Sequence, residues 1–120
     1  MVSNREYIQL VDRLTEMTQN GVMRWNRYEP PTNMVDTENN INFVYTTIYN
    51  RKNIRIYEED YKYYTDESEY YWSKRVVIEF IDESLNSVWQ FPKITNSWNL
   101  LDAVRYEDAG VADFMKSILG

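Results

Sequence analysis

The chain has 120 residues and a formal net charge of −6, and it contains neither cysteine nor histidine. A chain of this length fits one domain with a single core. Because the chain lacks cysteine and histidine, disulfides, thiolate chemistry and histidine-based proton transfer or metal ligation are excluded. The longest aliphatic run is Val76–Ile78, far below the roughly 20 apolar residues that span a bilayer, and the N-terminus lacks a signal pattern. We expect a cytoplasmic protein that does not contact a membrane.

An N-terminal helix is predicted to begin at Ser3, because Ser3 and Glu6 have the spacing of a capping box. Gly21 supplies a left-handed residue that can end the helix. Apolar side chains recur between these points at helical spacing. We expect this stripe to pack on a sheet, with a partner-binding helix as the alternative. The stripe consists of Tyr7, Ile8, Val11, Leu14, Met17 and Thr18.

Five strands are predicted to follow as an antiparallel meander. The first spans residues 22–28 and ends at two prolines, the second spans 43–49, and a hairpin turn at 50–53 leads to the third. The third strand changes phase after Ile56, which predicts a β-bulge near residues 58–60. The fourth, residues 70–82, alternates with period two and is the predicted central strand. The fifth spans residues 88–91.

Two short helices are predicted at the C-terminus. The first is capped by Thr95, Asn96 or Ser97, and the segment 108–110 separates it from the second, which spans residues 111–119. The predicted fold class is therefore α+β, with an N-terminal helix, a five-stranded antiparallel meander and two short C-terminal helices packed on one sheet face. Residues 1–120 form a single domain in this prediction.

The negative charge is concentrated in one segment. Between Tyr57 and Tyr71 there are six acidic residues and one base, a local charge of −5, whereas the other 105 residues carry thirteen acids and twelve bases, or −1. Tyrosine is enriched in binding hot spots, and carboxylates steer basic partners. We predict that this segment forms a binding surface for a basic protein partner. The alternative is a solvated hairpin whose acidic residues keep an edge strand from aggregating. The predicted surface comprises Tyr57, Glu58, Glu59, Asp60, Tyr61, Tyr63, Tyr64, Asp66, Glu67, Glu69 and Tyr70.

A second set of residues combines basic and aromatic side chains. Guanidinium groups pair with phosphate and aromatic rings stack on bases, so this combination favours a nucleotide ligand. Salt bridges to Glu29, Glu79 or the acidic segment are the alternative explanation. The candidate ligand-binding residues are Arg24, Trp25, Arg27, Arg55 and Arg75.

The spacing Thr18-x-x-Gly21-x-x-x-Trp25, placed after a helix and before a Tyr-rich meander, resembles the opening of many short uncharacterised bacterial and phage proteins. The resemblance covers about the first third of the chain. It implies a helix-plus-meander fold and no activity. The bias toward Asn, Ile and Tyr is typical of AT-rich coding, so we expect a phage, a mobile element or a low-GC bacterium as the source.

No motif for catalysis or metal binding is present. The glycines stand at positions 21, 110 and 120 and form no phosphate loop, and Asp66–Glu69 lacks the ligand pattern of a Ca²⁺ loop. We therefore expect a non-enzymatic protein without cofactor or metal that neutralises a protein partner, as an immunity protein, antitoxin or anti-defence factor does. A protein that sequesters or senses a nucleotide is the alternative. A homodimer is compatible with both, and double-stranded DNA is not an expected partner.

Overall fold

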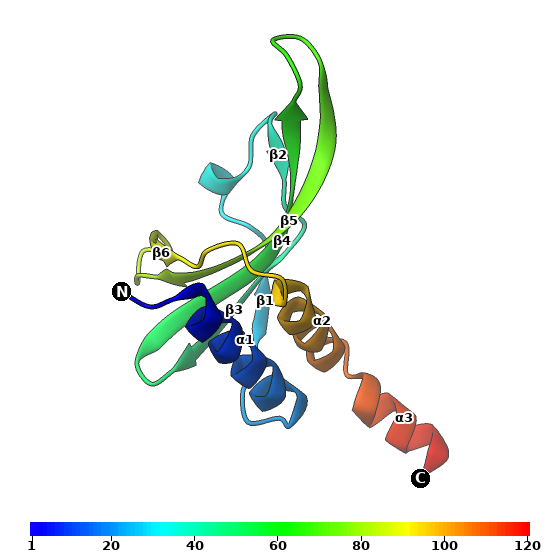
Figure 1. The fold of residues 1–120 in the computed structure, drawn as a ribbon. Helices are drawn as coiled ribbons and strands as arrows, with labels where there is room; N and C mark the ends of the chain where they lie inside the picture. The colour runs from blue at the N-terminus through cyan, green and yellow to red at the C-terminus, as the bar shows by residue number, and fades with distance from the viewer.

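The chain folds as a helix, an antiparallel sheet and two further helices, which confirms the predicted fold class (Figure 1). The structure is a computed structural model that describes residues 1–120. The helices are α1 (Asn4–Gln19), α2 (Ser97–Asp108), α3 (Val111–Leu119) and the short 3-10 helix η1 (Thr32–Met34). The strands are β1 (Asn26–Tyr28), β2 (Asn39–Asn40), β3 (Val44–Tyr49), β4 (Lys52–Tyr64), β5 (Tyr70–Ile81) and β6 (Ser87–Gln90).

The middle strand of the sheet is β4. The strand order is β1-β3-β4-β5-β6, and β2 adds to the part of β4 that extends past β3. The prediction that residues 70–82 form the central strand is therefore wrong, because these residues form β5, the neighbour of the central strand β4. β4 and β5 pair without interruption from Asn53–Ile81 to Tyr64–Tyr70, and their distal end projects from the body as a long hairpin (Figure 1).

The predicted bulge near residues 58–60 is also wrong, because the β4–β5 register is continuous there. The apparent change of phase arises because β4 is buried on both faces. Ile54 and Ile56 belong to the core under the helices, whereas Tyr57 packs on the opposite face with Ile41 and Met34. A strand covered on both sides reads as a continuous apolar run with no single phase.

The main core lies between the sheet and the helices α1 and α2. The predicted stripe of α1 faces this core, and Asn96 ties the two helices together by donating hydrogen bonds of 2.8 Å to the Ile8 carbonyl and to Asp12. Asn96 is the N-cap residue of α2, although its side chain makes no cap bond. The largest fully buried side chains are Val11, Thr18, Ile56, Leu100, Leu101 and Val104.

The start and end of α1 follow the predicted signals. The Ser3 hydroxyl accepts a hydrogen bond from the Glu6 amide, Glu6 accepts one from the Ser3 amide, and Gly21 has a φ of +73°. The first strand is shorter than predicted. The amides of Val22 and Met23 donate to the Met17 carbonyl instead of joining the sheet, so β1 begins only at residue 26.

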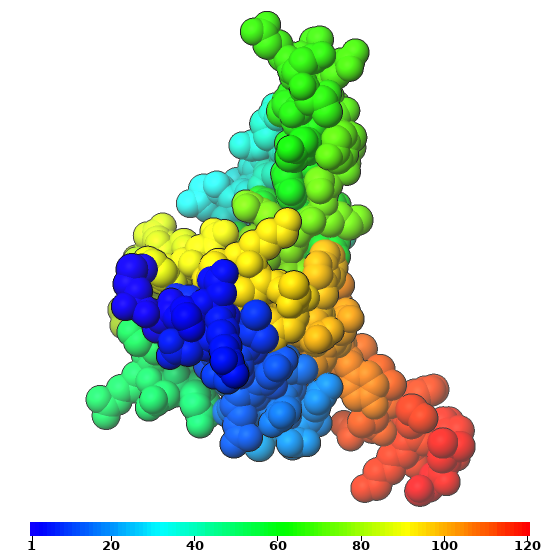
Figure 2. Space-filling view, in the orientation of Figure 1, coloured from blue at the N-terminus to red at the C-terminus, as the bar shows by residue number.

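Helix α3 leaves the body after a sharp turn. Gly110 adopts the left-handed conformation, with a φ of +67°, and directly precedes the helix. No residue of α3 is buried, and the helix projects away from the sheet as the red end of the chain in Figures 1 and 2. Its contacts with the rest of the chain are made chiefly through α2. No helix of the structure combines the length and the apolarity that crossing a bilayer requires.

A buried ion pair lies on the sheet face opposite α1 and α2. Arg55 and Glu79 are cross-strand partners, and both Nε and Nη2 of Arg55 lie 2.7 Å from the Glu79 carboxylate. Arg55 also donates a hydrogen bond of 3.1 Å to the Leu85 carbonyl. Each side chain is only 3% exposed, so the desolvated charges depend on each other.

Removal of one charge from this pair should be strongly destabilising. We expect Glu79→Ala to lower the free energy of unfolding by about 3–5 kcal/mol, because Arg55 is left buried without a counter-charge. Glu16→Ala is the matched control: it breaks the exposed Arg13–Glu16 pair and should cost about 0.5 kcal/mol or less. Urea denaturation monitored by circular dichroism gives both values, and equal losses would contradict the assignment.

Candidate functional site

The distal end of the β4–β5 hairpin carries a group of exposed aromatic rings. Tyr63 pairs with Tyr71 and Tyr64 with Tyr70 across the strands, with ring centroids 5.2 and 5.4 Å apart. Tyr70 also meets Trp72 edge-on at 6.3 Å. All five side chains are about half exposed, at 45–53%. We call Tyr63, Tyr64, Tyr70, Tyr71 and Trp72 the aromatic tip.

Polar contacts hold three rings of the aromatic tip in place, those of Tyr64, Tyr70 and Trp72. The Lys62 ammonium lies 4.5 Å from the Tyr70 ring centroid and 5.8 Å from that of Trp72. Tyr64 donates a hydrogen bond of 2.6 Å to the Glu38 carboxylate, and this bond raises the pKa of the Tyr64 phenol above its usual value. Because cation–π and hydrogen-bond contacts restrict the rings, less side-chain entropy is lost when they are bound.

The turn that closes the hairpin is acidic. Asp66 accepts hydrogen bonds of 2.8 Å from the amides of Ser68 and Glu69, which lower the pKa of the Asp66 carboxyl below its usual value. None of Asp66, Glu67 and Glu69 forms an ion pair, so their charges are unmatched. The turn therefore adds negative charge next to the aromatic tip.

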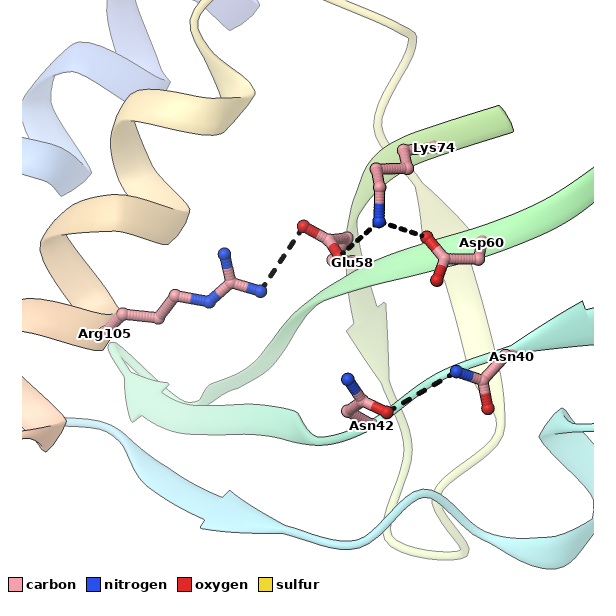
Figure 3. A network of polar contacts seen from close by, with 6 residues as sticks. All are labelled: Asn40, Asn42, Glu58, Asp60, Lys74 and Arg105. Carbon is pink, nitrogen blue, oxygen red and sulfur yellow. Dashed lines mark hydrogen bonds and ion pairs between the residues drawn. The ribbon is translucent and has the colours of Figure 1, made fainter. Parts of the chain in front are cut away.

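The carboxylates at the base of the hairpin have a different environment. Glu58 lies between Arg105 of α2, at 3.5 Å, and Lys74 of β5, at 3.6 Å, and Lys74 also pairs with Asp60 at 3.0 Å (Figure 3). The hydrogen bond and charge of Asp60, together with the charge of Glu58, raise the pKa of Lys74. These acids are thus neutralised within the chain.

Two further members of the predicted surface are buried. Glu59 lies 2.7 Å from the Arg75 guanidinium and accepts a hydrogen bond of 2.7 Å from Asn39. Burial, followed by the charges of Glu79 and Glu59, raises the pKa of the Tyr57 phenol. Tyr61 is partly buried, with the Arg75 guanidinium 5.4 Å from its ring centroid.

The predicted partner surface is therefore too large. Its proximal half, residues 57–61, is buried or matched by Lys74, Arg75 and Arg105, because the sheet and α2 bring those bases alongside it. Its distal half is exposed as predicted. Period-two alternation in residues 70–82 predicts that Trp72 lies on the core face together with Val76. Because β5 runs beyond the helices, Trp72 is instead half exposed in the aromatic tip.

The candidate ligand-binding residues do not form one site. Trp25 is buried and donates a hydrogen bond of 3.0 Å to Thr18, and Arg55 is engaged by Glu79. Every remaining arginine of the set has its own acidic partner. These pairs are Arg24–Glu107 at 3.7 Å, Arg27–Asp108 at 3.5 Å and Arg75–Glu59 at 2.7 Å.

One open cavity of about 660 Å³ is lined by both Arg24 and Arg55. Glu29, Asp82 and Glu83 line the same cavity, and these acids oppose an anionic ligand. Arg55 is already paired with Glu79. Salt bridging therefore accounts for the geometry of the basic set. Arg55 and Arg75 pair with Glu79 and the acidic segment as the alternative expects, whereas Arg24 and Arg27 pair with α2 and not with Glu29.

No protein-family model matches the chain, and no curated protein or solved structure matches it either. The resemblance to short bacterial and phage proteins stays a prediction. A function for this chain therefore has to be inferred from the geometry of its own surfaces.

The hydrogen bonds that Asp66 accepts predict how its carboxyl group titrates. We expect the amide resonances of Ser68 and Glu69 to report an Asp66 pKa below the ordinary value of 3.8. Because the folded pKa is lowered, the contribution of Asp66 to the turn is complete above the unfolded pKa and is lost as the pH falls through the folded pKa. NMR titration measures this, with Asp66→Ala as the control that abolishes the transition. A midpoint at or above 3.8 would contradict the described turn.

Proposed function

We propose that this protein is a non-enzymatic binding protein that inhibits or neutralises a protein partner, and that the aromatic tip is the docking element. One observation carries the proposal: a projecting hairpin presents five half-exposed aromatic rings beside an acidic turn without counter-charges. Tyr63 packs on Tyr71 on one side of the hairpin, and Tyr70 packs on Tyr64 and Trp72 on the other. Large aromatic side chains dominate the binding energy of protein interfaces, and exposed apolar groups of this size mark interaction sites.

The shape of the hairpin favours a partner with a concave site. The molecule measures 56 Å along its longest axis and only 29 Å along its shortest, and Figure 2 shows the hairpin end standing clear of the body. An arm of this kind can enter a cleft that the body cannot. Inside such a cleft, carboxylates can stand in for nucleic-acid phosphates, and tyrosine rings can fill the space of bases. An inhibitor of a nuclease or another DNA-binding enzyme would use this combination.

The charge distribution favours a basic partner. Residues 62–72 carry three acids and one base, a local charge of −2, and the three acids lie in the exposed turn. The acids at the base of the hairpin are matched within the chain. Because unmatched exposed charges steer association, the field that a partner meets comes mainly from the turn.

The proposal predicts which exposed aromatic residues a partner needs. Tyr71→Ala and Trp72→Ala should each weaken binding by about 2 kcal/mol, or roughly thirtyfold in dissociation constant, because both remove a hot-spot ring. Tyr106→Ala is the matched control, since Tyr106 is an equally exposed ring on α2. Quantitative affinity capture from host lysate should recover a protein with the wild type and Tyr106→Ala but not with the tip variants. Capture that is identical for all four proteins would reject the proposal.

A separate prediction concerns the association rate with the captured partner. Charge reversal at Glu67 and Glu69 should slow association about tenfold at low salt and much less at 0.5 M salt, where screening removes steering. Reversal at Glu29 and Glu83 changes the net charge equally at exposed positions on the body and should have a smaller effect. Stopped-flow experiments at both salt concentrations measure these association rates. Equal rates for the two double variants at low salt would exclude steering by the turn.

A further inference from the structure

Strand β5 has a hydrogen-bonding partner on only one side over its distal half. Its inner edge pairs with β4 along the whole hairpin, whereas β6 pairs with it only at residues 79–81. The next hydrogen bond, 2.8 Å long, runs from the Phe91 amide to the Ile78 carbonyl, and the chain then turns toward α2. No strand of the chain therefore covers the outer edge of Tyr70–Arg75 (Figure 1). We call it the β5 edge.

The register determines which backbone groups point outward along the β5 edge. In an antiparallel sheet the N–H and C=O of one residue point to the same side, and this side alternates from residue to residue. Because the Ile78 carbonyl points toward Phe91, the residues of even number point away from β4. The outward groups are thus the N–H and C=O of Tyr70, Trp72 and Lys74, and no backbone group of the chain is bonded to them.

We propose that the β5 edge takes up an extended segment of the protein partner as an additional antiparallel strand. The inference rests on the proposed function, because it states how the same hairpin would hold its partner. A row of donors and acceptors at strand spacing is satisfied by another extended backbone, and strand addition at an exposed edge is a recurrent mode of peptide binding. Tyr70 and Trp72 belong to both the β5 edge and the aromatic tip, so one segment would contact backbone and rings together.

The acidic turn determines the charge and the direction of this segment. Asp66, Glu67 and Glu69 directly precede β5 and have no ion-pair partner within the chain. In antiparallel pairing, the C-terminal end of the added strand lies beside the start of β5. The segment should therefore carry basic residues at its C-terminal end. Before them it should carry β-branched or aromatic side chains, which pack well beside an aromatic ring such as that of Trp72.

Lys74 lies on the β5 edge, where an unpaired lysine would oppose pairing with another chain. Its ammonium instead reaches across to β4, where it pairs with Asp60 at 3.0 Å and with Glu58 at 3.6 Å (Figure 3). The charge of Lys74 is therefore matched within the chain, and it does not oppose an added strand.

A second copy of the chain fits the β5 edge less well than a different protein. The outer strands of the sheet are β1 and β6, and their only basic residue is Arg27, which pairs with Asp108 at 3.5 Å. The β5 edge itself carries Lys74 and Arg75, and both are paired with acids of β4. Neither the outer strands nor the β5 edge of a second copy therefore offers unmatched bases to the acidic turn.

Titration of the full chain with a defined peptide tests the proposal. The synthetic peptide Thr-Val-Thr-Val-Thr-Val-Lys-Lys should shift the NMR amide resonances of Trp72 and Lys74 with a dissociation constant below about 1 mM. The control peptide, with Glu-Glu in place of Lys-Lys, should bind at least about tenfold more weakly. In the free chain these two amides should exchange with solvent at least about tenfold faster than that of Ser73, and the basic peptide should slow them. Absence of saturable shifts, or shifts confined to the acidic turn, would overturn the proposal.

Two variants at one position separate backbone pairing from side-chain contact. Lys74→Pro removes an outward N–H and keeps the N–H groups that bond to β4, and proline is tolerated on an edge strand. It should weaken binding of the basic peptide at least about tenfold, whereas Lys74→Ala should bind as the wild type does. Circular dichroism verifies folding, and the exchange rates of the wild type depend on neither variant. Equal binding by both variants would overturn the added strand but not the proposed function, which the capture experiment with Tyr71→Ala and Trp72→Ala tests separately.

Discussion

The continuous pairing of β4 with β5 is the constraint on which the rest of the structure depends. The register runs without a shift from Asn53–Ile81 to Tyr64–Tyr70, so every cross-strand pair in between lies on a defined face. One face receives Ile56 and Ile78 under the helices, and the other receives the Arg55–Glu79 ion pair. A shift of one residue would turn over the side chains of one strand, which would break the ion pair and place either Arg55 or Glu79 in the apolar core without its partner.

The same pairing explains why the aromatic tip is exposed. Helices α1 and α2 cover one face of the proximal hairpin, and the segment containing η1 and β2 covers the other. Both covers end before the hairpin does, and the strands continue past them (Figure 1). Tyr57 and Tyr71 belong to the same Tyr-rich segment, yet the first is buried and the second is exposed. Position along the hairpin, not residue type, separates core from surface.

The sequence predicts what is local and misses what depends on distant residues. The Ser3–Glu6 capping box and the Gly21 and Gly110 breaks are local signals, and all appear in the structure. The predicted bulge is wrong because Tyr57 is buried on the second face of β4 by residues about twenty positions away in the sequence, such as Met34 and Ile41. The predicted partner surface is too large for a related reason. Glu58 is matched by Arg105, which lies 47 positions away in the sequence.

The register of β4 with β5 also decides which aromatic rings a partner can contact together. Tyr63 and Tyr71 lie on one side of the hairpin, and Tyr64, Tyr70 and Trp72 lie on the other, because successive residues of paired strands alternate between the two sides. A flat partner surface can therefore contact only one of these two groups. A cleft that encloses the hairpin can contact both groups together with the acidic turn between the strands, so the arrangement of the aromatic tip favours a concave partner site over a flat one.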